Sequence, residues 1–194
     1  MSLTVEKCIE GWTNSLKQMN VKADIVFLGD SLTYYGDFST VFPDKVVCNL
    51  GLRGDTIDGM INRIGQVLIM QPEEIYLMAG INDVANSSVT EFETKYSTLI
   101  STLIQTLPHT KISVQSMLPV NNNHFNISCN NEQIINFNRS IKSIAKNNGL
   151  KYLDIYSIYA VNDELPHHLT RDGLHLKSEA YEQWYNYLIC ISNI

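Results

Sequence analysis

Short apolar runs alternate with amphipathic stretches along most of the chain. The runs with the character of buried strands cover residues 23–28, 46–48, 74–79, 111–117 and 150–155. Between them, apolar residues recur at three- and four-residue intervals, the spacing of one helix face. Strands that alternate with helices favour an α/β fold, because parallel neighbours need a crossover between them. We therefore predict a three-layer α/β/α sandwich with a five-stranded parallel sheet, in a single domain over residues 1–194.

The same spacing predicts four main helices. One stripe covers residues 57–68, where Gly54-Asp55-Thr56 offers an Asp or Thr cap at the start. A long stripe over 92–107 stops at Pro108, and another over 134–145 ends at Asn148-Gly149. We expect Ser178 to cap the last helix, whose apolar face carries Tyr181, Trp184, Tyr185, Leu188 and Ile189. The irregular segments 120–131 and 159–171 are expected to edge a pocket.

Polar motifs follow the first three predicted strands. Gly29-Asp30-Ser31-Leu32 comes directly after the first strand, and Asn49-Leu50-Gly51-Leu52-Arg53-Gly54 follows the second. Gly80-Ile81-Asn82-Asp83 follows the third, and Asp172-Gly173-Leu174-His175-Leu176 stands just before the last helix. Open α/β sheets bind their ligands at the carboxyl ends of the strands. These motifs are therefore the candidates for a site.

A serine, a histidine and an aspartate in these motifs fit nucleophilic catalysis. The hydroxyl of Ser31 must give up its proton as it attacks an acyl carbon, and His175 is a suitable base. Asp172, three residues before His175, can hold one tautomer of the imidazole and stabilise the imidazolium that forms. No Gly-x-Ser-x-Gly motif is present, so the usual α/β-hydrolase signature is missing.

The four motifs, in this order, resemble the SGNH subgroup of the GDSL esterase/lipase family over residues 24–184. The resemblance implies a flavodoxin-like fold and a cofactor-independent serine esterase. It also implies an oxyanion hole made by the backbone N–H groups of Ser31 and Gly51 and by the side-chain amide of Asn82. Glycine suits this role because it lacks a Cβ, and the carboxamide donates without adding negative charge.

Several of these residues also have a structural interpretation that needs no catalytic role. His175 alone could be a loop or capping histidine, and Gly51 with Gly54 could simply allow a turn. Arg53 either faces the pocket, where it would meet a carboxylate or a hydroxyl-rich substrate, or is a solvated surface residue.

Other polar residues are expected to be structural. We interpret Asp30 and Asp83 as hydrogen-bond acceptors that shape the loops around Ser31 and Asn82. His167 and His168 lie near Asp163 and Glu164 without metal-ligand spacing, so we predict a solvated loop and no metal site.

Composition narrows the class of partner. The formal net charge of −6 argues against nucleic acid or an anionic membrane, and favours small neutral or weakly charged substrates. Cys8, Cys48, Cys129 and Cys190 are scattered and do not form a disulfide framework. We find no membrane-spanning stretch and no signal segment. A soluble protein is expected, cytoplasmic if Met1 is the native start and exported if a leader has been removed.

The sequence thus predicts a serine esterase that hydrolyses short acyl esters, above all acetyl esters, of a carbohydrate or another small alcohol. A long-chain lysophospholipase or thioesterase is the alternative enzyme. A carbohydrate-binding module that has lost activity is the alternative from another class, and the intact set of Ser31, Asp172 and His175 argues against it. The oligomeric state stays open.

Overall fold

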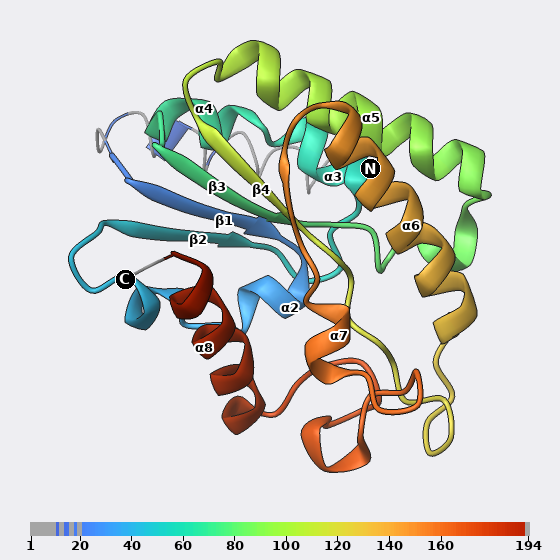
Figure 1. Ribbon diagram of the computed structural model, residues 1–194. Coiled ribbons are helices and arrows are strands. Elements are labelled where there is room, and N and C mark those ends of the chain that lie inside the picture. The colour runs from blue at the N-terminus through green and yellow to red at the C-terminus, as the bar shows by residue number, and fades with distance from the viewer. Residues whose placement is uncertain (1–10, 12–13, 16–17, 19–20, 193–194) are drawn as a thin grey trace.

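Five parallel strands form a sheet through the centre of the molecule (Figure 1). The computed structural model describes residue 11, residues 14–15, residue 18 and residues 21–192, so the expectations for Met1 and Cys8 lie outside the described residues. The sheet has the order β2-β1-β3-β4-β5. Its strands are β1 (Ile25–Gly29), β2 (Val47–Gly51), β3 (Glu74–Met78), β4 (Lys111–Gln115) and β5 (Lys151–Leu153). Each strand lies at a predicted apolar run, which confirms the fold class.

Helices cover both faces of this sheet (Figure 1). The strands alternate their side chains between the two faces, and Val26 and Leu28 pack into one hydrophobic cluster while Ile25 and Phe27 pack into the other. The first cluster is completed by α3 (Ile57–Asn62), α4 (Gly65–Met70), α5 (Val89–Thr106) and α6 (Asn131–Asn147). The second is closed mainly by α2 (Ser31–Tyr34) and α8 (Tyr181–Ser192). The short α7 (Tyr156–Tyr159) contributes to both clusters.

Four 3₁₀ turns complete the secondary structure of the described residues. They are η1 (Phe38–Val41), η2 (Val84–Asn86), η3 (His167–Leu169) and η4 (Ser178–Ala180). None of the described helices is long and apolar enough to cross a membrane. Cys48, Cys129 and Cys190 are free thiols.

The predicted helix over 57–68 is wrong in one respect, because the structure divides it into α3 and α4. The break lies at Arg63, whose backbone leaves the helical region at φ −109° and ψ 14°. Its buried side chain donates to Oδ2 of Asp55 over 2.7 Å and to the carbonyl of Gly29 over 3.1 Å. Arg63 therefore forms a buried ion pair with Asp55 at the end of α3.

Two details at helix ends also differ from the sequence prediction. Ser178 does not cap the last helix but lies inside η4, and no side chain caps that turn. Ile189 is exposed, whereas Tyr181, Trp184 and Leu188 on the same helix are buried. At the start of α3 the prediction of an Asp or Thr cap is confirmed for Thr56, whose Oγ1 accepts from the N–H of Gly59.

Candidate active site

Ser31 stands where strand β1 passes into helix α2. Asp30 is the N-cap of this helix, and its Oδ1 accepts from the N–H of Leu32 over 2.9 Å. Ser31 is the first helical residue and is only 5% exposed. Its backbone N–H donates to no acceptor among the described residues. The cap therefore holds the serine in a fixed place and leaves its amide free for a ligand.

His175 and Asp172 complete a chain of hydrogen bonds that begins at Ser31. Nε2 of His175 lies 2.9 Å from Oγ of Ser31, and Nδ1 lies 2.7 Å from Oδ2 of Asp172. A carboxylate can only accept, so Nδ1 carries the proton and Nε2 is free to accept the serine proton. The structure thus brings together the three residues proposed for catalysis, although 144 positions separate the serine from the histidine.

Asp172 is held as a carboxylate by the turn that it shares with His175. Its Oδ1 accepts from the N–H groups of His175 and Leu174, over 2.8 and 3.1 Å. Partial burial works to raise the pKa of Asp172, but these bonds and the imidazole contact outweigh it and lower the pKa below its ordinary value. Asp172 is therefore ionised throughout the neutral range, as the orientation of an imidazole requires.

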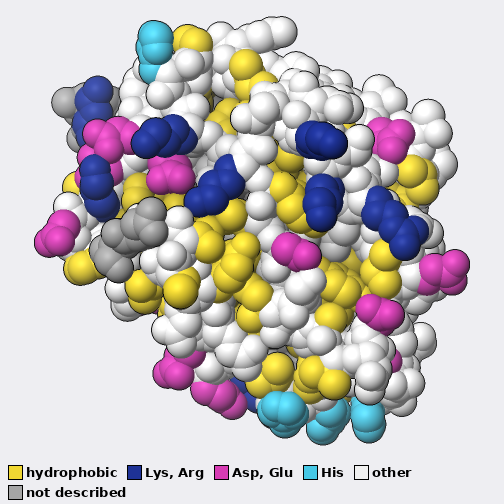
Figure 2. Space-filling view, in the orientation of Figure 1, with side chains coloured by type: hydrophobic (Ala, Val, Ile, Leu, Met, Phe, Trp, Pro, Cys, Tyr) yellow, Lys and Arg dark blue, Asp and Glu magenta, His cyan; other side chains and the backbone are white. Residues whose placement is uncertain are grey.

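The segments 120–131 and 159–171 are hydrogen-bonded through Asn121 to each other and to the candidate catalytic turn, residues 171–175. Its backbone N–H donates to the carbonyl of Gly173, and its Nδ2 donates to the carbonyl of Leu165, each over 2.7 Å. The two loops are therefore tied to the turn that carries His175. Figure 2 shows histidine side chains gathered at one end of this face. In these two loops the rings of His124 and His167 are 4.8 Å apart. No set of three or more potential metal ligands occurs in the described ranges.

The structure corrects the assignment of Gly51 as an oxyanion donor. Its backbone N–H donates over 2.8 Å to Oδ1 of Asn49, so this donor is already used. Gly51 is required for another reason: a Cβ there would overlap the backbone of Tyr34 in helix α2. The residue allows β2 to pack closely against the helix that begins at Ser31.

Gly54, in the same motif, is a further candidate donor that the sequence reasoning missed. It has a φ of +73°, which favours glycine, and its N–H donates to no acceptor within the described part of the chain. The neighbouring carbonyl of Asp55 accepts from Nδ2 of Asn82 over 2.8 Å. That bond uses one of the two side-chain amide hydrogens of Asn82. The other amide hydrogen of Asn82 and the backbone N–H of Gly54 are both left to donate to a ligand. Gly51 and Gly54 lie in the same motif, so the resemblance alone does not tell which of the two donates.

Buried carboxylates support the loops at the carboxyl edge of the sheet. Oδ2 of Asp83 accepts from the N–H of Ile57 over 3.1 Å, and Asp30 accepts from Leu32, so both act as the structural acceptors that the sequence predicts. Burial raises the pKa of Asp30 to about 7 and that of Asp83 to about 6. Burial also raises the pKa of Asp55, which Arg63 only partly offsets.

Arg53 lies against the aromatic ring of Tyr35, beside His175. Its guanidinium carbon lies 5.9 Å from the centre of that ring, and the side chain is exposed. The ring of Tyr35 in turn meets the ring of His175 edge to face, with 5.6 Å between centroids. The structure thus places Arg53 near the candidate site.

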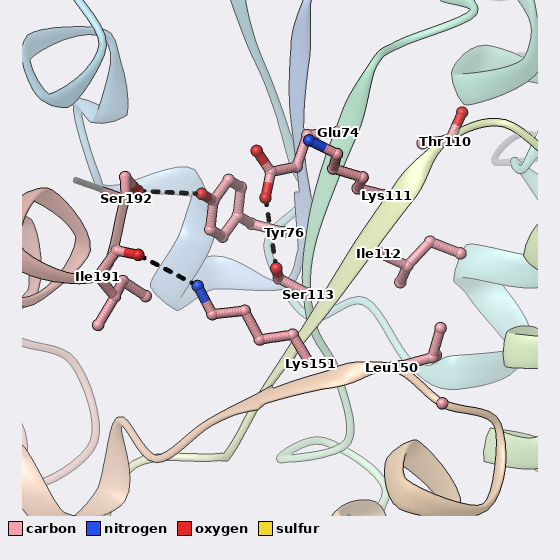
Figure 3. A pocket seen from close by; sticks show the side chains of 11 residues that line it. Glu74, Tyr76, Thr110, Lys111, Ile112, Ser113, Leu150, Lys151, Ile191 and Ser192 are labelled. Atoms are coloured by element: carbon pink, nitrogen blue, oxygen red, sulfur yellow. Dashed lines mark hydrogen bonds between the residues drawn. The ribbon is translucent and has the colours of Figure 1, made fainter. Parts of the chain in front are cut away.

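A hollow of about 510 Å³ lies at the other end of the sheet, at the amino ends of β3, β4 and β5 (Figure 3). Three pairs of polar groups within it bond to one another. Tyr76 meets Ser192, Lys151 donates to the carbonyl of Ile191, and Ser113 donates to Glu74. None of the proposed catalytic residues lines this hollow.

Comparison with known proteins gives one family and many similar structures. A model of the GDSL-like lipase/acylhydrolase family matches residues 27–183. No curated protein sequence matches the chain.

Three solved structures illustrate the structural likeness. A protein from Streptococcus pneumonia whose name refers to platelet activating factor has a TM-score of 0.80 at 22% identity, over 97% of this chain and 100% of its own. A GDSL-like lipase from Bacteroides thetaiotaomicron has a TM-score of 0.73 at 20% identity, over 96% of each chain. A variant of an acetyl xylan esterase from Geobacillus stearothermophilus has a TM-score of 0.70 at 18% identity, over 88% of this chain and 95% of its own. At these identities the structures show a shared fold.

Proposed function

The chain belongs to the GDSL-like lipase/acylhydrolase family, and from that premise we propose a serine esterase that removes a short acyl group, above all acetyl, from a carbohydrate or another small alcohol. Members of this family are carboxylic ester hydrolases. The observation that carries the catalytic assignment is the continuous chain of hydrogen bonds from Ser31 through His175 to Asp172. Acetyl xylan esterases among the similar structures support the choice of acyl group and alcohol.

The first half of the reaction transfers the acyl group to the enzyme. Oγ of Ser31 forms a bond to the acyl carbon as its proton passes to Nε2 of His175. Asp172 stabilises the imidazolium across the bond to Nδ1. When the tetrahedral intermediate collapses, the bond to the alcohol oxygen breaks and Nε2–H gives its proton to the leaving alcohol. An ester then joins the acyl group to Ser31.

The second half returns the enzyme to its starting state. A water molecule attacks the acyl carbon while Nε2 of His175 takes one of its protons. Collapse of this second intermediate breaks the bond to Oγ, and Ser31 regains the proton from Nε2–H. The products are a carboxylic acid and free enzyme, so no cofactor is needed to balance the reaction.

Three N–H groups would bind the negative oxygen of each intermediate. They are the backbone amide of Ser31, the backbone amide of Gly54, and the hydrogen of Asn82 that is not bonded to Asp55. The loops that carry them follow β1, β2 and β3, which are neighbours in the sheet. Donors fixed in advance stabilise developing charge strongly because they need no reorganisation during the reaction.

A panel of esters tests this function. The protein and its Ser31→Ala variant would be assayed on p-nitrophenyl esters from acetate to palmitate and on acetylated sugars. We expect kcat/KM to be highest for acetyl esters and activity to be lost in the variant. A maximum at long chains would instead indicate a lysophospholipase or thioesterase. No hydrolysis of any ester would favour an inactive carbohydrate-binding module.

A further inference from the structure

Tyr35 lies beside both ends of the serine–histidine pair. It follows Ser31 by one helical turn, and its N–H donates to the carbonyl of Ser31 over 3.1 Å. Its ring meets the ring of His175 edge to face, at an interplanar angle of 86°. The side chain is 36% exposed, so it belongs to the surface around the catalytic pair.

Two guanidinium groups from separate loops converge on this one ring. The guanidinium carbon of Arg171 lies 4.5 Å from the ring centre of Tyr35, and that of Arg53 lies 5.9 Å from it. Arg171 belongs to the catalytic turn, where its N–H donates to the carbonyl of His175 over 3.0 Å. Arg53 comes from the loop between β2 and α3. The fold thus concentrates positive charge next to the catalytic base.

Neither arginine has a charged partner in the described part of the chain. The ion pairs found there join Lys45 to Glu73, Arg63 to Asp55, Lys95 to Asp58 and His175 to Asp172. The whole sequence carries 20 acidic and 14 basic side chains, so acids outnumber bases, yet no carboxylate of residues 21–192 lies within 4.0 Å of Arg53 or Arg171.

This arrangement is electrostatically complementary to an anion. Two like charges beside one ring repel each other, and an exposed cation–π contact stabilises each of them only weakly. A bound anion would relieve the repulsion, and the planar guanidinium fork matches the geometry of carboxylate and phosphate oxygens.

We propose that Tyr35, Arg53 and Arg171 form a subsite that selects esters with a carboxylate or phosphate group on the alcohol part. The alcohol side is indicated because His175 gives its proton to the leaving alcohol, and the ring of Tyr35 lies against His175. This inference rests on the proposed esterase function. It replaces the expectation of neutral or weakly charged substrates, which was drawn from the net charge of the whole chain.

Matched acetyl esters test the subsite. The values of kcat/KM would be compared for an acetylated glucoside, the corresponding acetylated glucuronate and an acetylated glucose phosphate. We expect a preference of about tenfold or more for at least one anionic ester over the neutral one, and a decline of this ratio in high salt. Arg171→Gln and Arg53→Gln should each lower the ratio. Arg139→Gln, a change of an exposed arginine on α6, should keep it.

Binding measurements make the result independent of turnover. Titration calorimetry with Ser31→Ala would compare glucuronate, glucose phosphate and glucose, and the same ligands would be tested on Ser31→Ala combined with Arg53→Gln and Arg171→Gln. Tighter binding of an anionic sugar that is lost with the arginines supports the subsite, and the preferred anion identifies the group.

Equal kcat/KM values on neutral and anionic esters, with equal binding, would overturn the subsite and leave the esterase function intact. Absence of hydrolysis with every ester would overturn the esterase function instead, and the binding comparison would then decide on the subsite.

Discussion

The backbone N–H of Gly51 donates a hydrogen bond to Oδ1 of Asn49 over 2.8 Å. The side-chain nitrogen Nδ2 of Asn49 donates to the carbonyls of Thr33 and Gly36, each over 2.8 Å. The end of β2 is thereby fastened to helix α2 and the residues that follow it. Gly51 and Asn49 thus hold the helix that carries Ser31, and the oxyanion donors that we propose beside the Ser31 amide are Gly54 and Asn82.

Loss of the Asn82 amide should affect the transition state more than substrate binding. We expect Asn82→Ala to lower kcat by about 10²–10³, with a much smaller change in KM, because the contact strengthens as negative charge develops. Steady-state kinetics on an acetyl ester would show this. A rise in KM at unchanged kcat would mean that Asn82 binds the ground state and the transition state equally, and would contradict the oxyanion role.

Asp172 should act through the orientation and charge of the imidazole. The pKa of Asp172 is lowered, so its carboxylate is ionised at neutral pH. Asp172→Asn should lower kcat by up to about 10⁴ in steady-state assays at neutral pH, because the charge that orients and stabilises the imidazole is lost. Activity near the wild-type level would indicate a serine–histidine dyad.

The buried Asp30 should make the protein less stable as pH rises. Burial raises the pKa of its carboxyl from 3.8 to about 7, so the folded state holds a proton that the unfolded state has released. Stability therefore falls between about pH 4 and 7, by on the order of 3 kcal/mol from pH 5 to 8. In Asp30→Asn that part of the pH dependence should vanish, because asparagine does not titrate and can still cap Leu32.

Urea unfolding at pH 5 and pH 8 measures this difference. The exposed Asp44 provides a matched control, and Asp44→Asn should follow the wild-type pH dependence. An Asp30→Asn protein whose stability still declined to the wild-type extent would show that Asp30 is ionised in the folded state without penalty.

Arg63→Lys should lower the stability of the protein, although the positive charge is kept. Its guanidinium donates to both Asp55 and the carbonyl of Gly29, and a single ammonium cannot reproduce that fork. Breaking a buried pair of this kind costs about 3–5 kcal/mol when one partner is lost, so Arg63→Lys should lose a large part of that. Denaturant unfolding measures it, with the exposed Arg139→Lys as control. A variant as stable as the wild type would show that the pair contributes nothing.

The strands and the motifs after them could be predicted because parallel strands are buried on both faces and appear as continuous apolar runs. The interruption at Arg63 could not, because the apolar spacing continues through it and a helical arginine ordinarily faces water. Which of Gly51 and Gly54 keeps a free N–H could not be predicted either, because it depends on the side chain of Asn49, whose Oδ1 accepts from Gly51. Arg171 meets Tyr35 only after folding, so no local pattern marks it.

The most direct test of the central claim is covalent capture of the nucleophile. The protein would be treated with a fluorophosphonate, and the adduct would be located by intact-mass and peptide mass spectrometry. We predict one adduct per chain, on Oγ of Ser31, and none in Ser31→Ala. Labelling that persists undiminished in Ser31→Ala, or an active esterase that is never labelled at Ser31, would contradict the account.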